Sequence, residues 1–211
     1  MVPHPDDEAV MFGGLLARLA RRGTDVRVLA VTDGGAAYPD TVPRETLERT
    51  RRREQSAAMS ALGLPPDSAT RLGLPDGEVA HHEQQVIEAV LDLLGPRRVG
   101  SVVAPWEFDH HTDHEACGRA ALFAAKRASV PCSVAGGLFW SLLRSRPPSG
   151  IRLSSIDLTE AERTAKALAI GCHRSQVGST VTDRPVLTGR ELRGGRLVFG
   201  ALRGSRRGGL R

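Results

Sequence analysis

The pattern of apolar and polar positions predicts strands and helices that alternate along most of the chain. Apolar residues recur at helical spacing from Val10 to Leu19, on a helix that should end near Gly23. The β-branched run at 25–31 is typical of a buried strand. We expect further helices at 43–62, 82–94 and 113–128, and strands near 69–72, 99–104, 132–140 and 151–157.

Strands that alternate with helices are typical of an α/β protein with a mostly parallel central sheet and helices on both faces. A last helix should begin at Thr159, because Thr159 and Glu162 form the Ser/Thr-x-x-Glu pattern of a capping box. We expect a single domain over residues 1–200, since no internal repeat or boundary interrupts the pattern. Residues 201–211 are rich in glycine and arginine and are expected to form a disordered tail.

The first strand of this sheet is expected to be truncated. The first polar cluster of the chain should follow a strand, yet only Met1, Val2 and Pro3 precede it. A strand of ordinary length would need about five more residues. An upstream start of translation, a trimmed chain or a sheet that has lost part of its middle would each account for this.

Two clusters of histidines and acids lie where a predicted strand gives way to a predicted helix. The first cluster is HPDDE at 4–8, and the second is DHHTDHE at 109–115. Ligands bind to parallel sheets at the carboxyl ends of the strands. Both clusters therefore lie where a ligand site is expected.

Each cluster holds a pair of metal-binding side chains three positions apart. His4 and Asp7 form one pair, and His111 and His114 form the other. A hydrolytic zinc site takes three protein ligands, commonly histidine and carboxylate, and leaves one position for water. Acids at the start of a helix can also serve only as caps, and this alternative applies to either cluster taken alone. Two such clusters at strand ends favour a metal site.

Six short motifs, in order along the chain, resemble those of one known family. They are HPDDE (4–8), TDGG (32–35), RRRE (51–54), LGLPDG (72–77), HTDH (111–114) and HRSQ (173–176). Together they resemble the PIG-L/LmbE-like family of metal-dependent de-N-acetylases over residues 3–200. The chain departs from the family pattern at Thr112, which stands where the family usually has proline.

The resemblance implies a Rossmann-like fold and hydrolysis of the acetamide of an N-acetylamino sugar, a GlcNAc-type conjugate, to acetate and a free amine. It implies that the metal ligands are His4, Asp7 and His114. It implies that the catalytic residues are Asp6 as general base, His111 as oxyanion stabiliser or proton donor, and Asp113, which would orient His111. It implies that the hydroxyls of the sugar are contacted by Arg51 and Asp76. Zinc is the expected cofactor, and iron(II) also suits a site of histidine and carboxylate.

Two alternatives to sugar deacetylation are open at this point. The chain could be a hydrolase of a different amide in the same family, or a catalytically degenerate sugar-binding protein. Two residues also have two interpretations each. Trp106 could stack on a sugar ring or pack at the rim of the site, and His173 could reach the site or have a structural role.

The net charge of +5 suggests a nucleic-acid partner, but the position of the charge argues against one. Residues 190–211 hold seven arginines and one acid, so the rest of the chain is close to neutral. Binding of RNA or DNA through these arginines is the least favoured alternative. The expected partner is instead a small amino-sugar substrate.

The remaining composition indicates a cytoplasmic protein. No apolar run approaches the ~20 residues of a membrane span. The N-terminus lacks the basic segment and long apolar core of a signal peptide. The three cysteines are widely spaced and odd in number, so they provide no disulfide framework.

Overall fold

Helices and strands alternate along the residues that the computed structural model describes, which are 1–38, 40–95, 100–129, 131–144, 153–178 and 187, and the backbone of 196–202. The strands are β1 (Val28–Thr32), β2 (Ala69–Leu74), β3 (Ser101–Pro105), β4 (Ser133–Gly137), β5 (Leu153–Asp157) and β6 (Arg196–Leu202). The α-helices are α1 (Asp7–Val10), α2 (Gly13–Arg21), α3 (Arg44–Ala61), α4 (Glu83–Leu94), α5 (Thr112–Arg127), α6 (Trp140–Arg144), α7 (Glu160–Cys172) and α8 (Arg174–Val177). Two short 3-10 helices are η1 (Pro66–Ser68) and η2 (Val79–His82).

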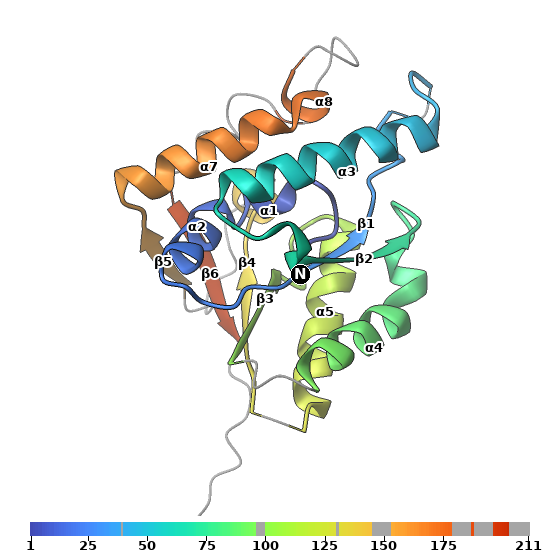
Figure 1. Cartoon of the computed structure of the whole chain (residues 1–211). Coiled ribbons are helices and arrows are strands. Elements are labelled where there is room, and N and C mark those ends of the chain that lie inside the picture. The colour runs from blue at the N-terminus through green and yellow to red at the C-terminus, as the bar shows by residue number, and fades with distance from the viewer. Residues whose placement is uncertain are drawn as a thin grey trace, which may run out of the picture.

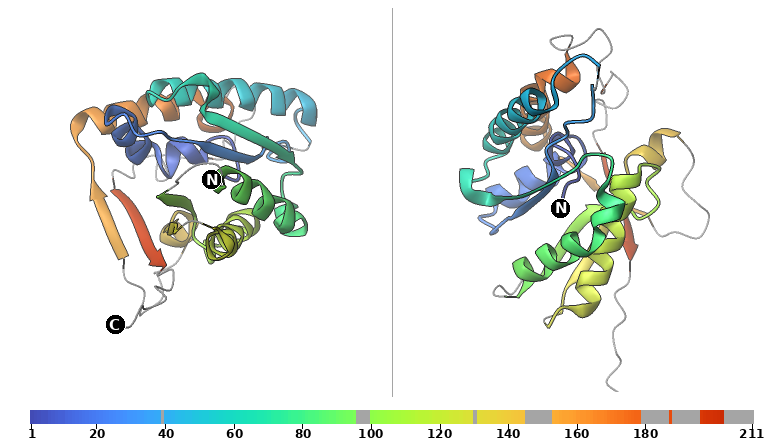
Figure 2. Two further views of the ribbon diagram at one scale, coloured as in Figure 1. Left: turned by 60° about the horizontal axis from the view of Figure 1, so that its bottom comes forward. Right: turned by 90° about the vertical axis from the view of Figure 1, so that its right-hand side faces the viewer.

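Strand β1 lies between two layers of helices. All five of its residues are buried. Val28 and Ala30 belong to a core shared with α1, α2, α3 and α7, whereas Leu29 and Val31 belong to a second core shared with α4 and α5. Figure 1 shows α3 and α7 side by side on one side of the strands and α4 with α5 on the other, and Figure 2 shows the same layers from two further directions. The predicted arrangement of strands with helices on both faces is confirmed.

The strands form two sheets, and their pairings are half parallel. β1 pairs with β2 in parallel, and β3 pairs with β4 in parallel. β6 runs antiparallel to both β4 and β5, so the second sheet has the order β3-β4-β6-β5. This antiparallel strand is not among those expected from the sequence. Residues 201 and 202 belong to β6, and residues 203–211 lie outside the described residues, so the expected boundary between domain and tail stays a prediction.

The segment Met1–Pro3 lies between the two sheets and contacts both. The N–H of Val2 donates to the carbonyl of Leu29 at 2.9 Å, and the N–H of Val31 donates to the carbonyl of Val2 at 3.0 Å. On the opposite side, the Met1 ammonium donates to the carbonyl of Val103 at 2.7 Å. Val2 therefore forms an isolated parallel bridge with Ala30 of β1, and Met1 is hydrogen-bonded to β3.

The helix ends follow local signals in the sequence. The predicted capping box at Thr159 is present, since its side chain accepts from the N–H of Glu162 and the Glu162 carboxylate accepts from the N–H of Thr159. Gly63 follows α3 with a φ of 79°, a conformation that glycine adopts without strain. The helix expected from Val10 is instead divided into α1 and α2, with Met11 and Phe12 between them.

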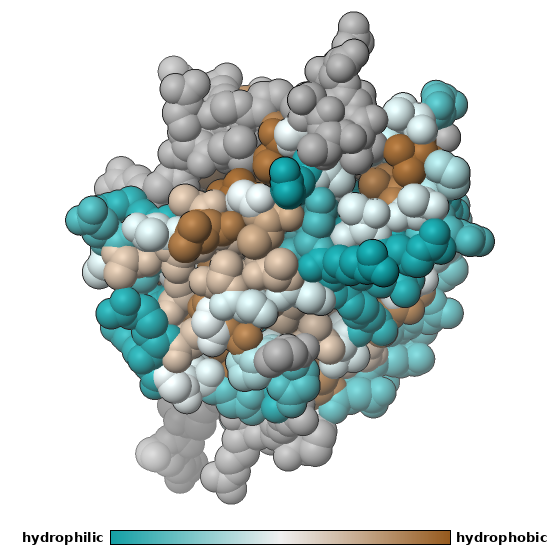
Figure 3. Space-filling view, turned by 45° about the horizontal axis from the view of Figure 1, so that its top comes forward, coloured by the Kyte–Doolittle hydropathy of each residue, from teal (hydrophilic) through white to brown (hydrophobic). Residues whose placement is uncertain are grey.

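The outer surface of the α3 and α7 layer mixes polar and apolar residues. Figure 3 views the molecule from this side, with hydrophilic residues gathered at its right and apolar residues near the middle. On α7, Leu168 is 62% exposed. None of the helices in the described part of the chain is long and apolar enough to cross a membrane.

Gly118 allows α5 to approach the end of β3, and replacing it is expected to destabilise the fold. A Cβ atom at Gly118 would lie 2.7 Å from both the carbonyl oxygen of Pro105 and the backbone nitrogen of Glu107. Gly118→Ala should therefore cost about 1–3 kcal/mol, as other overpacking changes do. This cost corresponds to a fall of several degrees in the melting temperature, at about 2–4 °C per kcal/mol.

Gly171→Ala is the matched control, because Gly171 also lies in a helix but a Cβ there meets nothing within 4 Å. Alanine has the higher helix propensity, so this variant should melt at or above the temperature of the parent chain. Equal melting temperatures for the two variants would show that α5 does not depend on this close approach.

Candidate active site

The two polar clusters meet at the carboxyl ends of adjacent strands. His4 follows the bridge segment directly, and the next residues turn into α1. The loop after β3 carries the second cluster into α5, where His111 is the N-terminal cap and accepts from the N–H of Asp113. The rings of His4 and His114 lie 5.5 Å apart, although the residues are 110 positions apart in the chain.

His4, Asp7 and His114 are buried and converge on one point. One oxygen of the Asp7 carboxylate lies 3.3 Å from Nδ1 of His4, and the other lies 3.4 Å from Nε2 of His114. Each residue offers a ligand atom within 4.8 Å of those of the other two. Two imidazoles and one carboxylate are a donor set that suits zinc and leaves a coordination position for water. The residues present therefore fit a divalent metal ion.

The side chains of this group shift one another's pKa values through their charges and hydrogen bonds. Burial opposes ionisation of Asp7, but His114 and His4 outweigh it and hold the pKa of Asp7 well below its usual range. Burial likewise opposes protonation of His114, yet Asp7 and Asp109 raise its pKa to about 9. The site thus holds carboxylates in their anionic form around a point where positive charge is favoured.

A second group, made of His4, His111 and Asp113, overlaps the first. The Asp113 carboxylate already accepts the N–H groups of Gly77 at 2.8 Å and Val79 at 3.2 Å, and it lies 3.1 Å from Nε2 of His4. Its oxygens are therefore largely occupied by the loop before α4. This observation favours the first group as the metal-binding set.

Asp109 fixes the orientation of His114. The side chain of Asp109 is fully buried, and one oxygen lies 2.9 Å from Nδ1 of His114. The other oxygen accepts the N–H groups of Phe139 and Ser141 and the hydroxyl of Ser141. With Nδ1 bound to Asp109, Nε2 of His114 faces Asp7 and is free to bind a metal. Asp109 opens the second cluster, but no role for it was predicted from the sequence.

Asp6 sits beside the metal-binding group in a strained backbone conformation. Its φ is 136°, which is rare for a residue with a side chain. Its carboxylate lies 3.1 Å from Nη2 of Arg51. Burial raises the pKa of Asp6 to about 6, even though Arg51 lowers it. The strained turn therefore presents a carboxylate whose proton affinity lies close to neutral pH.

Arg51 and Asp76 hold the loops around this turn. The buried guanidinium of Arg51 donates to the carbonyls of Pro5 at 2.7 Å and Gly34 at 2.8 Å. One oxygen of Asp76 lies 3.2 Å from Nε2 of His4, and the other accepts the N–H of Ala36. Both side chains line the cleft described below. Their expected contact with substrate stays a prediction.

His111 and Asp113 contact each other through the backbone. Nδ1 of His111 accepts the N–H of Asp113 at 3.3 Å, while the Asp113 carboxylate lies against His4. Burial, together with the neighbouring charges of His4 and His114, lowers the pKa of His111 to about 4. The His111 imidazole is therefore neutral near pH 7, and its Nε2 carries the proton. The expected orienting contact runs through the main chain of Asp113 and not through its carboxylate.

A cleft of about 410 Å³ opens over these residues. Phe139, Trp140 and Leu187 form part of its apolar wall. The Trp140 ring stacks on that of His111 with a centroid distance of 6.4 Å. Trp106, by contrast, is only 3% exposed and packs against Phe108. The aromatic residues in the wall of the cleft are therefore Phe139 and Trp140, and neither was predicted from the sequence.

Glu8 and His173 form a buried pair that contacts the turn at Asp6. Both are fully buried, and Nε2 of His173 lies 2.6 Å from the Glu8 carboxylate. The second oxygen of Glu8 accepts the N–H of Asp6 and the side-chain amide of Gln55. Glu8 thereby ties the strained turn to α3 and to the end of α7. Of the two interpretations of His173, the structural one agrees with these contacts.

The known proteins to which this chain is similar are named as deacetylases. Residues 1–125 match the family PIG-L: GlcNAc-PI de-N-acetylase. The diacetylchitobiose deacetylase of Thermococcus kodakarensis is 30% identical over 133 residues, which cover 61% of this chain and 49% of that protein. A probable N-acetyl-α-D-glucosaminyl L-malate deacetylase 2 of Bacillus cereus is 32% identical over 133 residues, covering 59% of each. The matched region thus spans about half of the length of these curated relatives.

A solved structure extends the likeness of the fold to nearly the whole chain. The A40926 pseudoaglycone deacetylase Dbv21 superposes with a TM-score of 0.71 over 95% of both chains, at 19% identity. Fold and site together define an α/β protein with a buried group of histidine and aspartate, at the ends of its strands, that could hold a metal ion. The chain belongs to the PIG-L family.

Proposed function

We propose that this protein is a metal-dependent N-deacetylase that hydrolyses the acetamide of an N-acetylamino sugar of the GlcNAc type. The observation that carries the proposal is the buried group of His4, Asp7 and His114 with the Asp6 carboxylate next to it at the floor of one cleft. A metal-binding group beside a carboxylate of raised pKa is the arrangement that amide hydrolysis by activated water requires.

Zinc is the metal we propose for His4, Asp7 and His114. When bound, zinc lowers the pKa of a coordinated water from 15.7 to about 7 and polarises a carbonyl. The side chains prepare its position in advance, because Asp109 orients His114 and the N–H of His4 donates to Asp7 at 2.9 Å. Iron(II) would suit the same donors.

Asp6 acts as the general base in this proposal. Its pKa of about 6 leaves it ionised at neutral pH and close enough to that pH to take and release a proton. Arg51 holds the carboxylate in place at 3.1 Å. Asp6 would take the proton of the attacking water and pass it to the nitrogen of the departing amine. The products are acetate and a free amino sugar.

His111 stabilises the charge that develops on the amide oxygen. Its ring is neutral near pH 7, and its Nδ1 accepts from the Asp113 backbone, so its Nε2–H is the donor available to the substrate. A donor fixed before the reaction stabilises an oxyanion at little reorganisation cost. Asp113 contributes by fixing this tautomer through its N–H.

The wall of the cleft agrees with a small sugar conjugate. Arg51 and Asp76 offer charged groups to hydroxyls, and Trp140 offers an aromatic face beside His111. The two curated relatives are named as deacetylases of diacetylchitobiose and of a GlcNAc–malate conjugate, which share an N-acetylglucosamine unit. We infer a small GlcNAc conjugate as the substrate, and no nucleic-acid partner. The free cysteines Cys117, Cys132 and Cys172 support a cytoplasmic location.

Acetate release from a panel of compounds tests this function. The zinc-loaded chain should release acetate from GlcNAc conjugates, and chelation of the metal should abolish the release. Simple N-acetyl amides are expected to react far more slowly. Release from simple amides alone would favour a different amidase, and binding of GlcNAc conjugates without release would indicate a degenerate sugar-binding protein.

A further inference from the structure

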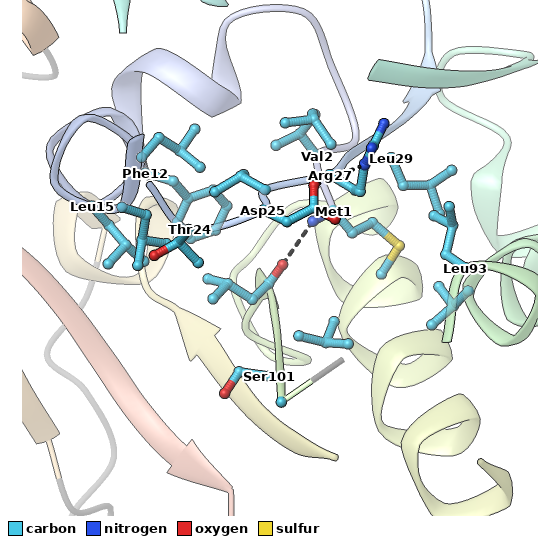
Figure 4. A pocket seen from close by; sticks show the side chains of 18 of the residues that line it. Met1, Val2, Phe12, Leu15, Thr24, Asp25, Arg27, Leu29, Leu93 and Ser101 are labelled. Atoms are coloured by element: carbon cyan, nitrogen blue, oxygen red, sulfur yellow. Dashed lines mark hydrogen bonds and ion pairs between the residues drawn. The ribbon is translucent and has the colours of Figure 1, made fainter. Parts of the chain in front are cut away.

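The strained turn at Asp6 is held by side chains that take no part in the proposed reaction. A φ of 136° is rare for a residue with a side chain, and such conformations persist only where the surroundings hold them. Before the turn, Met1 and Val2 are hydrogen-bonded to β3 and β1, and the dashed line in Figure 4 marks the contact of Met1 with Val103. Beyond the turn, the Glu8 carboxylate accepts the N–H of Asp6 at 3.1 Å.

Gln55 and Arg71 extend this contact toward the surface. The side-chain amide of Gln55 donates at 2.9 Å to the same Glu8 oxygen that accepts the N–H of Asp6. The carbonyl of that amide accepts from Nη1 of Arg71 at 2.6 Å. Glu8 and Gln55 are fully buried, whereas the Arg71 side chain is 25% exposed. A continuous row of hydrogen bonds therefore joins the backbone of the turn to a partly exposed side chain on β2.

The hydrogen bonds of this row run in one direction only. A guanidinium only donates, and an ionised carboxylate only accepts. The Gln55 amide must therefore turn its oxygen to Arg71 and its NH₂ to Glu8. The opposite orientation would lose both bonds and leave buried polar groups unpaired, which is costly. The row is thus a fixed support for the turn.

Helix α3 holds the turn at two points through one face. Arg51 and Gln55 are four positions apart, so they lie one above the other on the same side of the helix. Arg51 binds the Asp6 carboxylate at 3.1 Å, and Gln55 reaches the N–H of Asp6 through Glu8. Figure 1 shows α1, which begins at the turn, next to α3. Separate side chains of one helix therefore fix the carboxylate and the backbone of Asp6.

Both ends of the row are anchored. Nε2 of His173 lies 2.6 Å from the other oxygen of Glu8 and keeps this carboxylate at the turn. At the outer end, Nη1 of Arg71 lies 3.5 Å from the buried carboxylate of Asp33. Asp33 thereby keeps the guanidinium beside Gln55.

We propose that Gln55 and Arg71 are positioning residues for the general base: acting through Glu8, they keep the turn in the conformation that presents the Asp6 carboxylate to the attacking water. The inference rests on the proposed role of Asp6 in deacetylation. Neither Gln55 nor Arg71 is among the described residues that line the cleft. A misplacement of about 1 Å at the reacting groups costs about 10²-fold in rate, so a remote support of the base has a measurable effect.

The test measures kcat, KM and zinc content for Gln55→Leu and Arg71→Met, with diacetylchitobiose and the methyl glycoside of N-acetylglucosamine as substrates. Gln55→Leu should lower kcat by about 10–100-fold. Arg71→Met, which acts from further away, should lower kcat by about 2–30-fold. KM should stay within about twofold and zinc at about one per chain, because substrate and metal contacts are intact. Arg71→Lys keeps a donor for Gln55 and should restore most of the rate.

Two exposed residues provide matched controls. Gln85→Leu on α4 and Arg53→Met on α3 repeat the chemical changes at the surface and should match the parent. Hydrogen exchange at the N–H of Asp6 gives a readout that needs no activity. Gln55→Leu should speed this exchange by about tenfold or more, because the acceptor of the N–H is no longer fixed. If Gln55→Leu fails to fold, the two substitutions of the partly exposed Arg71 carry the test.

Two outcomes would overturn the proposal. One is a kcat equal to that of the parent in both Gln55→Leu and Arg71→Met. The other is a fall in kcat that comes with loss of zinc, which would indicate general damage to the site. A parent chain that releases no acetate from any GlcNAc conjugate would instead remove the proposed function. In that case, faster exchange at Asp6 would retain Gln55 and Arg71 as supports of the turn, and unchanged exchange would overturn this inference too.

Discussion

Asp7→Asn is expected to lose its metal, whereas the same change at the neighbouring residue, Asp6→Asn, is expected to keep the metal and lose the chemistry. Asp7 lies between His4 and His114 at 3.3 and 3.4 Å, so its carboxylate is the anion that both imidazoles share. Without that anion, metal affinity should fall by more than the roughly 10–100-fold typical of groups that only orient a ligand. Metal content after dialysis measures this loss.

Asp6→Asn leaves the three metal-binding side chains intact. It preserves the shape of the strained turn and removes only the capacity to take a proton. The expected result is about one zinc per chain and a kcat lower by about 10²–10⁴-fold, as for other general bases. Metal content and kcat for the two variants, measured side by side, separate the roles. Zinc retained in both variants with activity intact would exclude the proposed hydrolase. Loss of zinc from Asp6→Asn alone would make Asp6 the metal ligand and Asp7 the general base.

Asp109→Asn is expected to weaken metal binding without unfolding the protein. Its single carbonyl oxygen can replace the oxygen that accepts from Phe139 and Ser141. The amide NH₂ then faces Nδ1 of His114, where the carboxylate accepted before. Nδ1 would have to accept, so the proton would move to Nε2, the atom that faces Asp7. Metal affinity should fall by about 10–100-fold.

Asp92→Asn is the control for Asp109→Asn, because Asp92 is exposed on α4 and undergoes the same chemical change. Metal titration and thermal unfolding of both variants measure the effect. Asp92→Asn should match the parent in both measurements. Unchanged metal affinity in Asp109→Asn would show that Asp109 serves only to hold Phe139 and Ser141 in place.

The predictions from sequence were most accurate where the signal is local. The capping box of Thr159, the end of α3 near Gly63 and the two clusters at strand ends each depend on residues close together in the chain. The convergence of His4 and His114 could be expected as well, because strands of a parallel sheet end on the same side.

The remaining features depend on contacts between distant segments, which a single sequence does not encode in a readable form. Asp109 binds Phe139 and Ser141 some thirty positions away, so nothing next to Asp109 marks it as an anchor. The antiparallel strand β6 follows the last predicted helix and pairs with β4, which lies far earlier in the chain. Helix-strand alternation alone predicts a parallel partner, and only pairing geometry reveals the reversal.

The position of Asp109 between His114 and the start of α6 has a consequence for binding equilibria. One oxygen of Asp109 binds Nδ1 of His114 and also accepts the N–H of Trp140. The other oxygen accepts the N–H of Phe139. A metal ion that fixes the position of His114 would therefore also fix the backbone at the wall of the cleft. If the metal strengthens sugar binding by some factor through this link, the sugar must strengthen metal binding by the same factor. In the proposed deacetylase, the resting protein would then exchange its metal more readily than the protein that holds substrate.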